Sequence, residues 1–293
     1  MTQETASEVQ FPNSAATTQP LPLRVICLHG HPGSGAAFGD LVAFLKEQGI
    51  TAIAPDLRGY GNFQVKNPFQ MQDHVNDLWE RLQKEPQYRY VLVGWSLGGI
   101  IAMELAWRYL ATPQDLRPKL VGLALVGTAA HPVRNLPPMS WSDFGNTFLA
   151  ILCHWLLPYG TRWHMDHIGK RSLLRYLIHR HDPAVYQKLA TLGAKAVIQT
   201  SRHATNALSQ AISAGYNRNQ DLKQIDLPCL VITGIHDRHI SSKASQETAA
   251  LLPNHELHCY DDAAHLLPWE QPERFHRDLY DWLNSQILPV KQD

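Results

Sequence analysis

The chain of 293 residues is long enough for one large α/β domain that carries an insertion. Apolar residues make up 44% and charged residues 18%, a globular composition that excludes a disordered chain or a coiled coil. Lysine plus arginine equals aspartate plus glutamate at 26 each, so no overall field favours nucleic acid or an acidic membrane as a partner.

The start of the chain is small and polar, without the basic residues and apolar core of a signal peptide. We interpret residues 1–21 as a flexible tail and expect a cytoplasmic protein. No later run of about eighteen apolar residues occurs, so no membrane span is predicted. The cysteines are scattered rather than paired, and we expect all of them to be reduced: Cys27, Cys153, Cys229 and Cys259.

Short apolar, β-branched runs alternate with amphipathic stretches along the first half of the chain, which is typical of a parallel sheet. Strands are predicted at residues 24–28, 51–54, 90–93 and 120–126. Helices are predicted between them at residues 36–48, 71–84 and 97–110. The strands are nearly continuous apolar runs, as buried parallel strands are.

Residues 131–220 interrupt this alternation with a segment that is rich in Trp, His and Arg and contains no convincing strand. The alternation then returns, with strands at residues 229–233 and 256–260, a helix at residues 243–252 and a closing helix after Pro272. We therefore predict a doubly wound, mostly parallel α/β core formed by residues 22–130 and 221–293. A helical cap is predicted as an insertion at residues 131–220.

Ser96 lies in the run GWSLGG (residues 94–99), directly after an apolar strand and at the start of a helix. This is the strand–turn–helix context of a nucleophile elbow, in which glycines on either side of the serine permit a sharp turn. The turn exposes the hydroxyl, and the start of the helix offers backbone N–H groups to developing negative charge. The pattern predicts Ser96 as a nucleophile, with an ordinary serine in a strand-to-helix turn as the alternative.

A serine hydroxyl is a weak nucleophile unless a base and an orienting carboxylate activate it. Asp237 follows the first strand after the interruption and His265 follows the last strand, so both are expected where parallel strands end at one edge of the sheet. Ser, Asp and His also occur in the chain order of this triad on a doubly wound sheet. We predict Asp237 as the acid and His265 as the base, with Asp261 and Asp262 as alternative acids.

The first strand ends in the glycine-rich run HGHPGSG (residues 29–35). Its backbone N–H groups can face a tetrahedral intermediate, and we assign the oxyanion hole to the N–H groups of His31 and Leu97. The run lacks the spacing of a P-loop or of a dinucleotide-binding turn. Histidine pairs at 164/167 and 179/181 have no carboxylate or cysteine at metal-ligand spacing, so we expect neither a metal nor another cofactor.

These motifs, together with the run DLRGYG (residues 56–61), the turn GIHD (residues 234–237) and the late histidine, resemble the α/β-hydrolase superfamily. Within it the chain looks like the capped esterases, epoxide hydrolases, dehalogenases and C–C bond hydrolases. Epoxide hydrolases and haloalkane dehalogenases of this type place Asp where Ser96 stands, so the resemblance implies a capped serine esterase. Two departures are Ala264, where the family usually has glycine, and the short segment before Arg24, which predicts fewer than eight strands.

Small-ligand pockets are mostly apolar, so aromatic and apolar side chains near the nucleophile and in the predicted cap are candidates for a pocket wall. These candidates are Trp95, Trp141, Phe144, Phe148, Trp155, Leu156 and Trp163. Packing of the cap onto the core is the alternative for each cap residue. A basic stretch in the cap either receives an anionic group of the substrate, with Arg175 as a pocket candidate, or forms a solvated helix face. It consists of Arg171, Arg175, His179, Arg180 and His181.

These residues predict a serine hydrolase that cleaves a small carboxylic ester, thioester or amide through an acyl-enzyme on Ser96. The substrate is expected to carry an apolar acyl or alkyl part. In one alternative the same triad transfers protons in a C–C bond hydrolase or lyase. In another, the hydrolase fold is a non-catalytic binding protein for a small ligand or a partner. We expect a monomer or a small homo-oligomer.

Overall fold

The computed structural model describes residues 21–133, 140–156 and 163–288, so nearly all of the predicted tail lies outside the described residues. Its sheet has six strands, all parallel, in the order β2-β1-β3-β4-β5-β6. The strands are β1 (Leu23–Leu28), β2 (Thr51–Ile53), β3 (Arg89–Trp95), β4 (Lys119–Val126), β5 (Cys229–Gly234) and β6 (His255–Tyr260). They match the predicted strands to within one or two residues at each end, and the sheet has fewer than eight strands, as expected.

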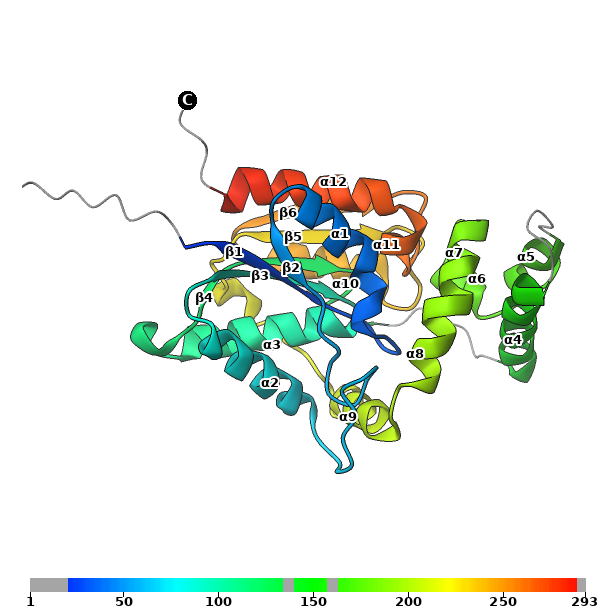
Figure 1. Cartoon of the computed structure of the whole chain (residues 1–293), viewed down its shortest axis with the longest axis horizontal. Coiled ribbons are helices and arrows are strands. Elements are labelled where there is room, and N and C mark those ends of the chain that lie inside the picture. The colour runs from blue at the N-terminus through cyan, green and yellow to red at the C-terminus, as the bar shows by residue number, and fades with distance from the viewer. Residues whose placement is uncertain (1–20, 134–139, 157–162, 289–293) are drawn as a thin grey trace, which may run out of the picture.

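Helices pack against both faces of the sheet (Figure 1). One layer contains α1 (Gly39–Glu47), α11 (Leu267–Glu270) and α12 (Pro272–Trp282). The other contains α2 (Met71–Lys84), α3 (Leu97–Ala111) and α10 (Ser242–Leu251). Because side chains alternate along a strand, Val25 of β1 packs into the first layer and Ile26 into the second. This arrangement confirms the predicted doubly wound α/β fold.

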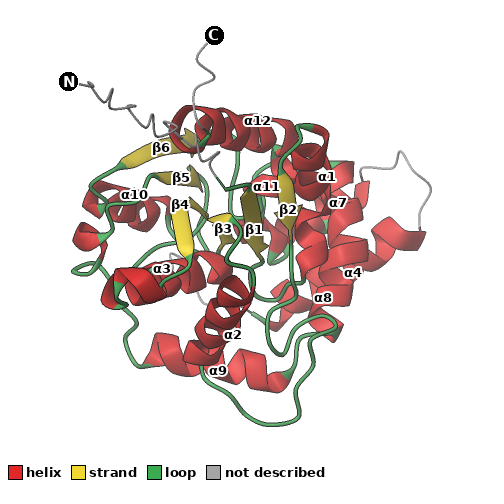
Figure 2. Cartoon of the chain, turned by 60° about the vertical axis from the view of Figure 1, so that its left-hand side comes forward, coloured by secondary structure: helices red, strands yellow, loops and turns green. Residues whose placement is uncertain are grey.

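The described part of the chain between β4 and β5 consists of helices joined by loops and contains no strand. Its helices are α4 (Trp141–Leu156), α5 (Trp163–His167), α6 (Leu174–Leu177), α7 (Pro183–Lys188), α8 (Ala194–Ile198) and α9 (Arg202–Ser213). Short 3₁₀ or π turns lie at Gly35–Phe38, Gln114–Leu116, Gly169–Arg171, Leu189–Gly193, Leu222–Gln224 and Leu283–Ile287. The helices α4 to α8 lie beyond the carboxyl ends of the strands (Figure 1), and Figure 2 shows α4, α7 and α8 grouped on one side of the molecule.

The order of the strands reverses at β1, which lies between β2 and β3. In open α/β sheets, ligands bind outside the carboxyl ends of the strands at such a topological switch point. The glycine-rich run after β1 and Ser96 after β3 therefore lie where a substrate site is expected. Among the described residues, no helix is long and apolar enough to cross a membrane.

Candidate active site

Ser96 occupies the sharp turn between β3 and α3, with φ 54° and ψ −115°. It is the only residue other than glycine with positive φ in the described part of the chain. The first turn of α3 also lies so close to the neighbouring strand β1 that a Cβ on Gly98 would be 1.9 Å from the carbonyl oxygen of Leu28. The positive φ of Ser96 is a backbone strain that costs about 1–3 kcal/mol and persists only where the surrounding structure fixes it. One contact that fixes the turn is the hydrogen bond that the Thr128 hydroxyl donates to the carbonyl oxygen of Ser96 at 2.8 Å.

His265 lies between Ser96 and Asp237. Its Nε2 is 3.1 Å from the Ser96 Oγ, and its Nδ1 is 2.7 Å from the Asp237 Oδ2. Because a carboxylate only accepts, Nδ1 carries the proton, and Nε2 is then free to accept the serine hydroxyl proton. All three residues are buried. The indole N–H of Trp95 also donates to the carbonyl oxygen of His265 at 3.0 Å, which fixes the backbone that carries the imidazole.

Asp237 is held by its own loop. Its Oδ1 accepts the backbone N–H groups of His239 and Ile240 at 2.9 and 3.0 Å, which leaves Oδ2 to the imidazole. The alternative acids lie elsewhere: Asp261 is exposed, and Asp262 bonds the Gln271 amide and is 3.5 Å from a guanidinium nitrogen of Arg180. The structure therefore brings Asp237 to His265, and neither of the two aspartates that precede His265 in sequence.

Two residues that the sequence analysis did not single out hold the loop after β1. Buried His29 donates from Nδ1 to the carbonyl oxygen of Gly30 at 2.9 Å, and its Nε2 accepts the Leu57 N–H at 3.0 Å. Burial lowers the pKa of His29 to about 4, which keeps this imidazole neutral. The carboxylate of Asp56 accepts the Gly35 N–H at 2.8 Å and a second N–H of its own loop at 2.7 Å.

The two residues assigned to the oxyanion hole follow neighbouring strands of the sheet, β1 and β3. His31 follows β1, and its ring Nδ1 lies 2.9 Å from the hydroxyl of Tyr60. Leu97 is the first residue of α3, and the first N–H groups of an α-helix have no acceptor within the helix. Both β1 and β3 end at the switch point of the sheet, where a ligand site is expected.

A cavity of about 320 Å³ opens beside Ser96 and His265. The core contributes Trp95, Leu266 and Trp269 to its wall. The loop at residues 30–34 and His239 also line the cavity. The chain between β4 and β5 contributes most of the remaining wall, and its side chains there are mostly apolar: Thr147, Ile151, Leu173, Leu174, Tyr176, Leu177, Leu189, Leu192, Ala194, Ala196 and Val197. Within the described residues, the wall of this cavity contains no Asp, Glu, Lys or Arg.

Most of the aromatic pocket candidates lie away from this cavity. Trp95 lines it, whereas the side chains of Trp141, Phe144, Phe148, Leu156 and Trp163 do not line it and are exposed. Trp141, for example, is 91% exposed. The prediction that these five residues form the pocket wall is wrong. On α4, Thr147 and Ile151 face the cavity and four of the five candidates are exposed, and Trp163 is exposed on α5. The side chain of Trp155 lies outside the described residues.

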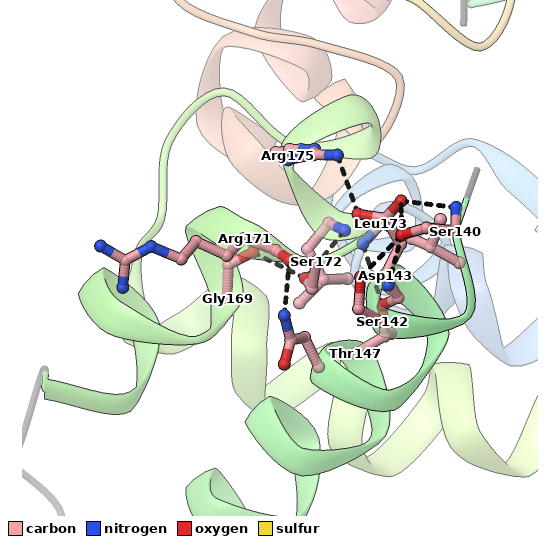
Figure 3. A network of polar contacts seen from close by, with 11 residues as sticks. Ser140, Ser142, Asp143, Thr147, Gly169, Arg171, Ser172, Leu173 and Arg175 are labelled. Carbon is pink, nitrogen blue, oxygen red and sulfur yellow. Dashed lines mark hydrogen bonds and ion pairs between the residues drawn. The ribbon is translucent and has the colours of Figure 1, made fainter. Parts of the chain in front are cut away.

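Arg175 is likewise directed away from the cavity, by a polar network at the start of α4 (Figure 3). Its guanidinium donates to the Asp143 Oδ1 at 2.8 Å, and the N–H and hydroxyl of Ser140 donate to Oδ2. The hydrogen bonds from Ser140 and the nearby Arg175 hold the pKa of Asp143 below its ordinary value. Thr147 accepts the Leu173 N–H at 3.0 Å in the same network. Arg175 therefore fixes the wall of the cavity through Asp143 and does not line it, contrary to expectation.

The other members of the basic stretch do not form one surface. The ring of His179 stacks on His236, with centroids 3.7 Å apart, and His181 lies 2.8 Å from the hydroxyl of Tyr186. Arg180 is near Asp262, and the Arg171 side chain extends away from the network in Figure 3. These separate contacts do not converge on a single anion-binding site.

A model of the alpha/beta hydrolase family matches residues 25–278 of the chain. The chain belongs to the α/β-hydrolase family. This membership confirms the resemblance that the motifs indicated and makes the protein a hydrolase. The α/β hydrolase is 25% identical to the uncharacterized hydrolase YugF of Bacillus subtilis, over 88% of this chain and 89% of that one. It is 27% identical to a non-heme chloroperoxidase of Kitasatospora aureofaciens, over 89% and 92% of the two chains.

Solved structures share the fold of this α/β hydrolase. An esterase from Thermogutta terrifontis aligns with a TM-score of 0.68 and 23% identity, over 92% of each chain. The esterase EaEST from Exiguobacterium antarcticum aligns with a TM-score of 0.66 and 20% identity, over 90% of this chain and 93% of that one. At these identities the likeness describes the backbone, and the chemistry rests on the side chains of this chain.

Proposed function

We propose that the protein is a serine esterase with Ser96 as nucleophile, His265 as general base and Asp237 as the orienting acid. The observation that carries this proposal is the continuous hydrogen-bonded chain from Asp237 through His265 to Ser96, which ends at an apolar cavity. A pimeloyl-[acyl-carrier protein] methyl ester esterase of Shewanella woodyi, 24% identical over 89% of this chain and 94% of that one, supports ester hydrolysis.

The proposed reaction follows from the order of these contacts. His265 Nε2 takes the proton of Ser96 as Oγ attacks the ester carbonyl, and Asp237 stabilises the imidazolium that forms. The N–H groups of His31 and Leu97 donate to the oxyanion. Collapse of the intermediate returns the proton to the leaving alcohol. Water, deprotonated by His265, then releases the acid from the acyl-enzyme on Ser96.

The wall of the cavity supports a neutral, apolar acyl or alkyl group in the substrate. The helices between β4 and β5, which we propose as a cap, contribute leucine, isoleucine, valine and alanine side chains to it. A carboxylate or phosphate placed among them would lose its hydration without gaining a charged partner, which is strongly unfavourable. We therefore propose that the enzyme prefers uncharged esters over esters whose acyl chain ends in a carboxylate.

Hydrolysis of p-nitrophenyl esters by purified protein tests the proposal. Ser96→Ala should lower kcat by at least about 10⁴-fold, as expected for loss of a triad nucleophile. Ser285→Ala, which removes an exposed hydroxyl of the closing helical turn, is the matched control and should retain wild-type kcat. Undiminished turnover by Ser96→Ala would exclude the assignment.

The acid is tested separately. Asp237→Asn should be nearly inactive, and Asp262→Asn should keep most of the wild-type activity, because its carboxylate contacts Gln271 and Arg180 and not His265 among the described residues. The opposite result would transfer the role to Asp262. An acyl adduct on Ser96, detected by mass spectrometry during turnover, distinguishes the esterase from an enzyme that uses the same residues only to transfer protons.

A further inference from the structure

Glu270 is a buried carboxylate that has no part in the proposed reaction. It ends α11 on the core side of the molecule and is 7% exposed. Its Oε1 accepts the Ala264 N–H at 2.8 Å, and its Oε2 accepts the N–H groups of His179 and Arg180 at 2.7 and 2.9 Å. Within the described residues Glu270 makes no ion pair, so backbone N–H groups alone stabilise its charge.

These three N–H groups come from two separate segments. Ala264 directly precedes His265, whereas His179 and Arg180 belong to residues 177–180 of the proposed cap, which we term the cap strap. Figure 1 shows α11 on the side of the core that faces α7, which follows the strap. Glu270 therefore joins the loop that carries His265 to the cap strap.

The cap strap makes further contacts with the same part of the core, one of which is the ion pair between Arg180 and Asp262. The Leu266 N–H donates to the carbonyl oxygen of Leu177 at 3.0 Å, so the strap is tied to the residues on both sides of His265. The ring of His179 also stacks on His236, with an angle of 5° between the planes. Because His236 directly precedes Asp237, the strap contacts the loops of both the proposed base and the proposed acid.

Burial of a carboxylate costs free energy, so a buried carboxylate at this position indicates that its hydrogen bonds have a role. Burial raises the pKa of Glu270, and the three N–H donors act in the opposite direction. An apolar side chain in its place would leave these buried N–H groups without this acceptor. An uncharged amide would also present an N–H₂ group to at least one of the donors, because only one of its two ends accepts. The carboxylate is therefore the side chain that can hold both segments at once.

We propose that Glu270 is a positioning residue that aligns His265 with Ser96 and Asp237 by tying its loop to the cap strap. The proposal rests on the esterase function proposed above. The imidazole is productive only while both its nitrogens stay within hydrogen-bond reach, and a displacement of about 1 Å can lower a rate by about 100-fold. Contact of the cap strap with the core and alignment of His265 are therefore coupled.

The isosteric variant Glu270→Gln tests this role against a matched control. Asp278→Asn changes a carboxylate of α12 that accepts the Tyr260 hydroxyl at 2.8 Å and lies 2.9 Å from the His258 Nδ1. With a short p-nitrophenyl ester, Glu270→Gln should lower kcat by about 10- to 100-fold and change KM by less than about twofold. Asp278→Asn should lower Tm without changing kcat. Wild-type kcat in folded Glu270→Gln would overturn the proposal.

A second readout does not depend on turnover. The proton on the Nδ1 of His265, bonded to Asp237 at 2.7 Å, should give a downfield NMR signal that is absent in His265→Gln. In Glu270→Gln this signal should be lost or broadened by exchange, and an unchanged signal would contradict the proposal. If the wild-type protein hydrolyses no ester, the esterase proposal fails while this measurement still decides the role of Glu270.

Native-state hydrogen exchange of the unsubstituted protein covers the case in which Glu270→Gln does not fold. The amides of Ala264, His179 and Arg180 share one acceptor residue, so they should exchange through the same opening event with the same free energy. Exchange of Ala264 through a different opening from that of the strap amides would overturn the coupling.

Discussion

His29 should make the folded state sensitive to acid. Its pKa of about 4 lies well below the ordinary imidazole value of 6.5, because the ring is completely buried. The unfolded chain therefore binds a proton between these two pH values and the folded protein does not, so stability falls as pH falls from about 6.5 to about 4. At about 1.4 kcal/mol per pH unit the whole window corresponds to about 3 kcal/mol from this one residue.

The variant His29→Gln isolates this contribution. Its amide oxygen can still accept the Leu57 N–H, but the carbonyl oxygen of Gly30 loses the imidazole donor, which costs about 1–3 kcal/mol at neutral pH. Urea unfolding should show that the free energy of unfolding of wild type, relative to that of His29→Gln, falls by about 2–3 kcal/mol between about pH 7.5 and about pH 4.5. His131→Gln, which removes an exposed imidazole, is the control.

The reasoning would be refuted if wild type and His29→Gln differed in free energy of unfolding by the same amount at both pH values. It would mean that the imidazole is protonated equally in the folded and unfolded chains, and that burial of the ring does not determine its charge. Comparison with a variant, rather than the pH dependence of wild type alone, is needed because buried His74 has its pKa lowered to about 4 by burial as well.

Two further predictions concern the elbow and the cavity. Gly98→Ala should lower kcat by at least about 100-fold, because its Cβ would lie 1.9 Å from the carbonyl oxygen of Leu28 and the Ser96 turn would have to shift; Gly39→Ala, where a Cβ meets nothing within 4 Å, is the control. Ile151→Trp should fill part of the cavity and lower the ratio of kcat/KM for an octanoyl over an acetyl ester by about tenfold. Phe148→Trp, on the exposed face of α4, should leave this ratio within about twofold of wild type, and an equal effect of both variants would contradict the observed cavity wall.

The strands and the relative positions of Ser96, Asp237 and His265 were predictable because they follow from local patterns and one topological rule. Each strand is a short apolar run, and parallel strands end at a common edge. Residues in the loops after β3, β5 and β6 therefore had to lie at the same edge, although Asp237 and His265 are 28 positions apart. No knowledge of side-chain packing was needed for this step.

The pocket wall was not predictable in the same way. α4 is apolar on two faces, so periodicity alone cannot tell that Ile151 lines the cavity while Phe148 is exposed. Arg175 was misassigned because its partner, Asp143, lies 32 positions earlier, and no pattern of charges reveals such a pair.

The partners of His29, Asp56 and Glu270 were also not predictable from sequence. All three accept backbone N–H groups, and Glu270 takes two of its donors from residues about 90 positions away. Every residue other than proline has a backbone N–H, so the sequence does not show which residues donate one. The motifs HGHP and DLRGYG did contain His29 and Asp56, and they were the available signal for these two.

The separation between the sheet and the helical segment that joins β4 to β5 has a practical consequence for engineering. The groups proposed for bond cleavage end strands of the core, whereas most of the cavity wall belongs to helices between β4 and β5. A chimera that receives this segment from a relative should therefore inherit the donor's chain-length preference while keeping its own chemistry. The choice of segment is constrained, because the transplanted chain must still present two consecutive N–H groups to Glu270. Libraries that diversify α4 and α8 but leave residues 177–180 intact should therefore contain more active members than libraries that randomise the whole segment.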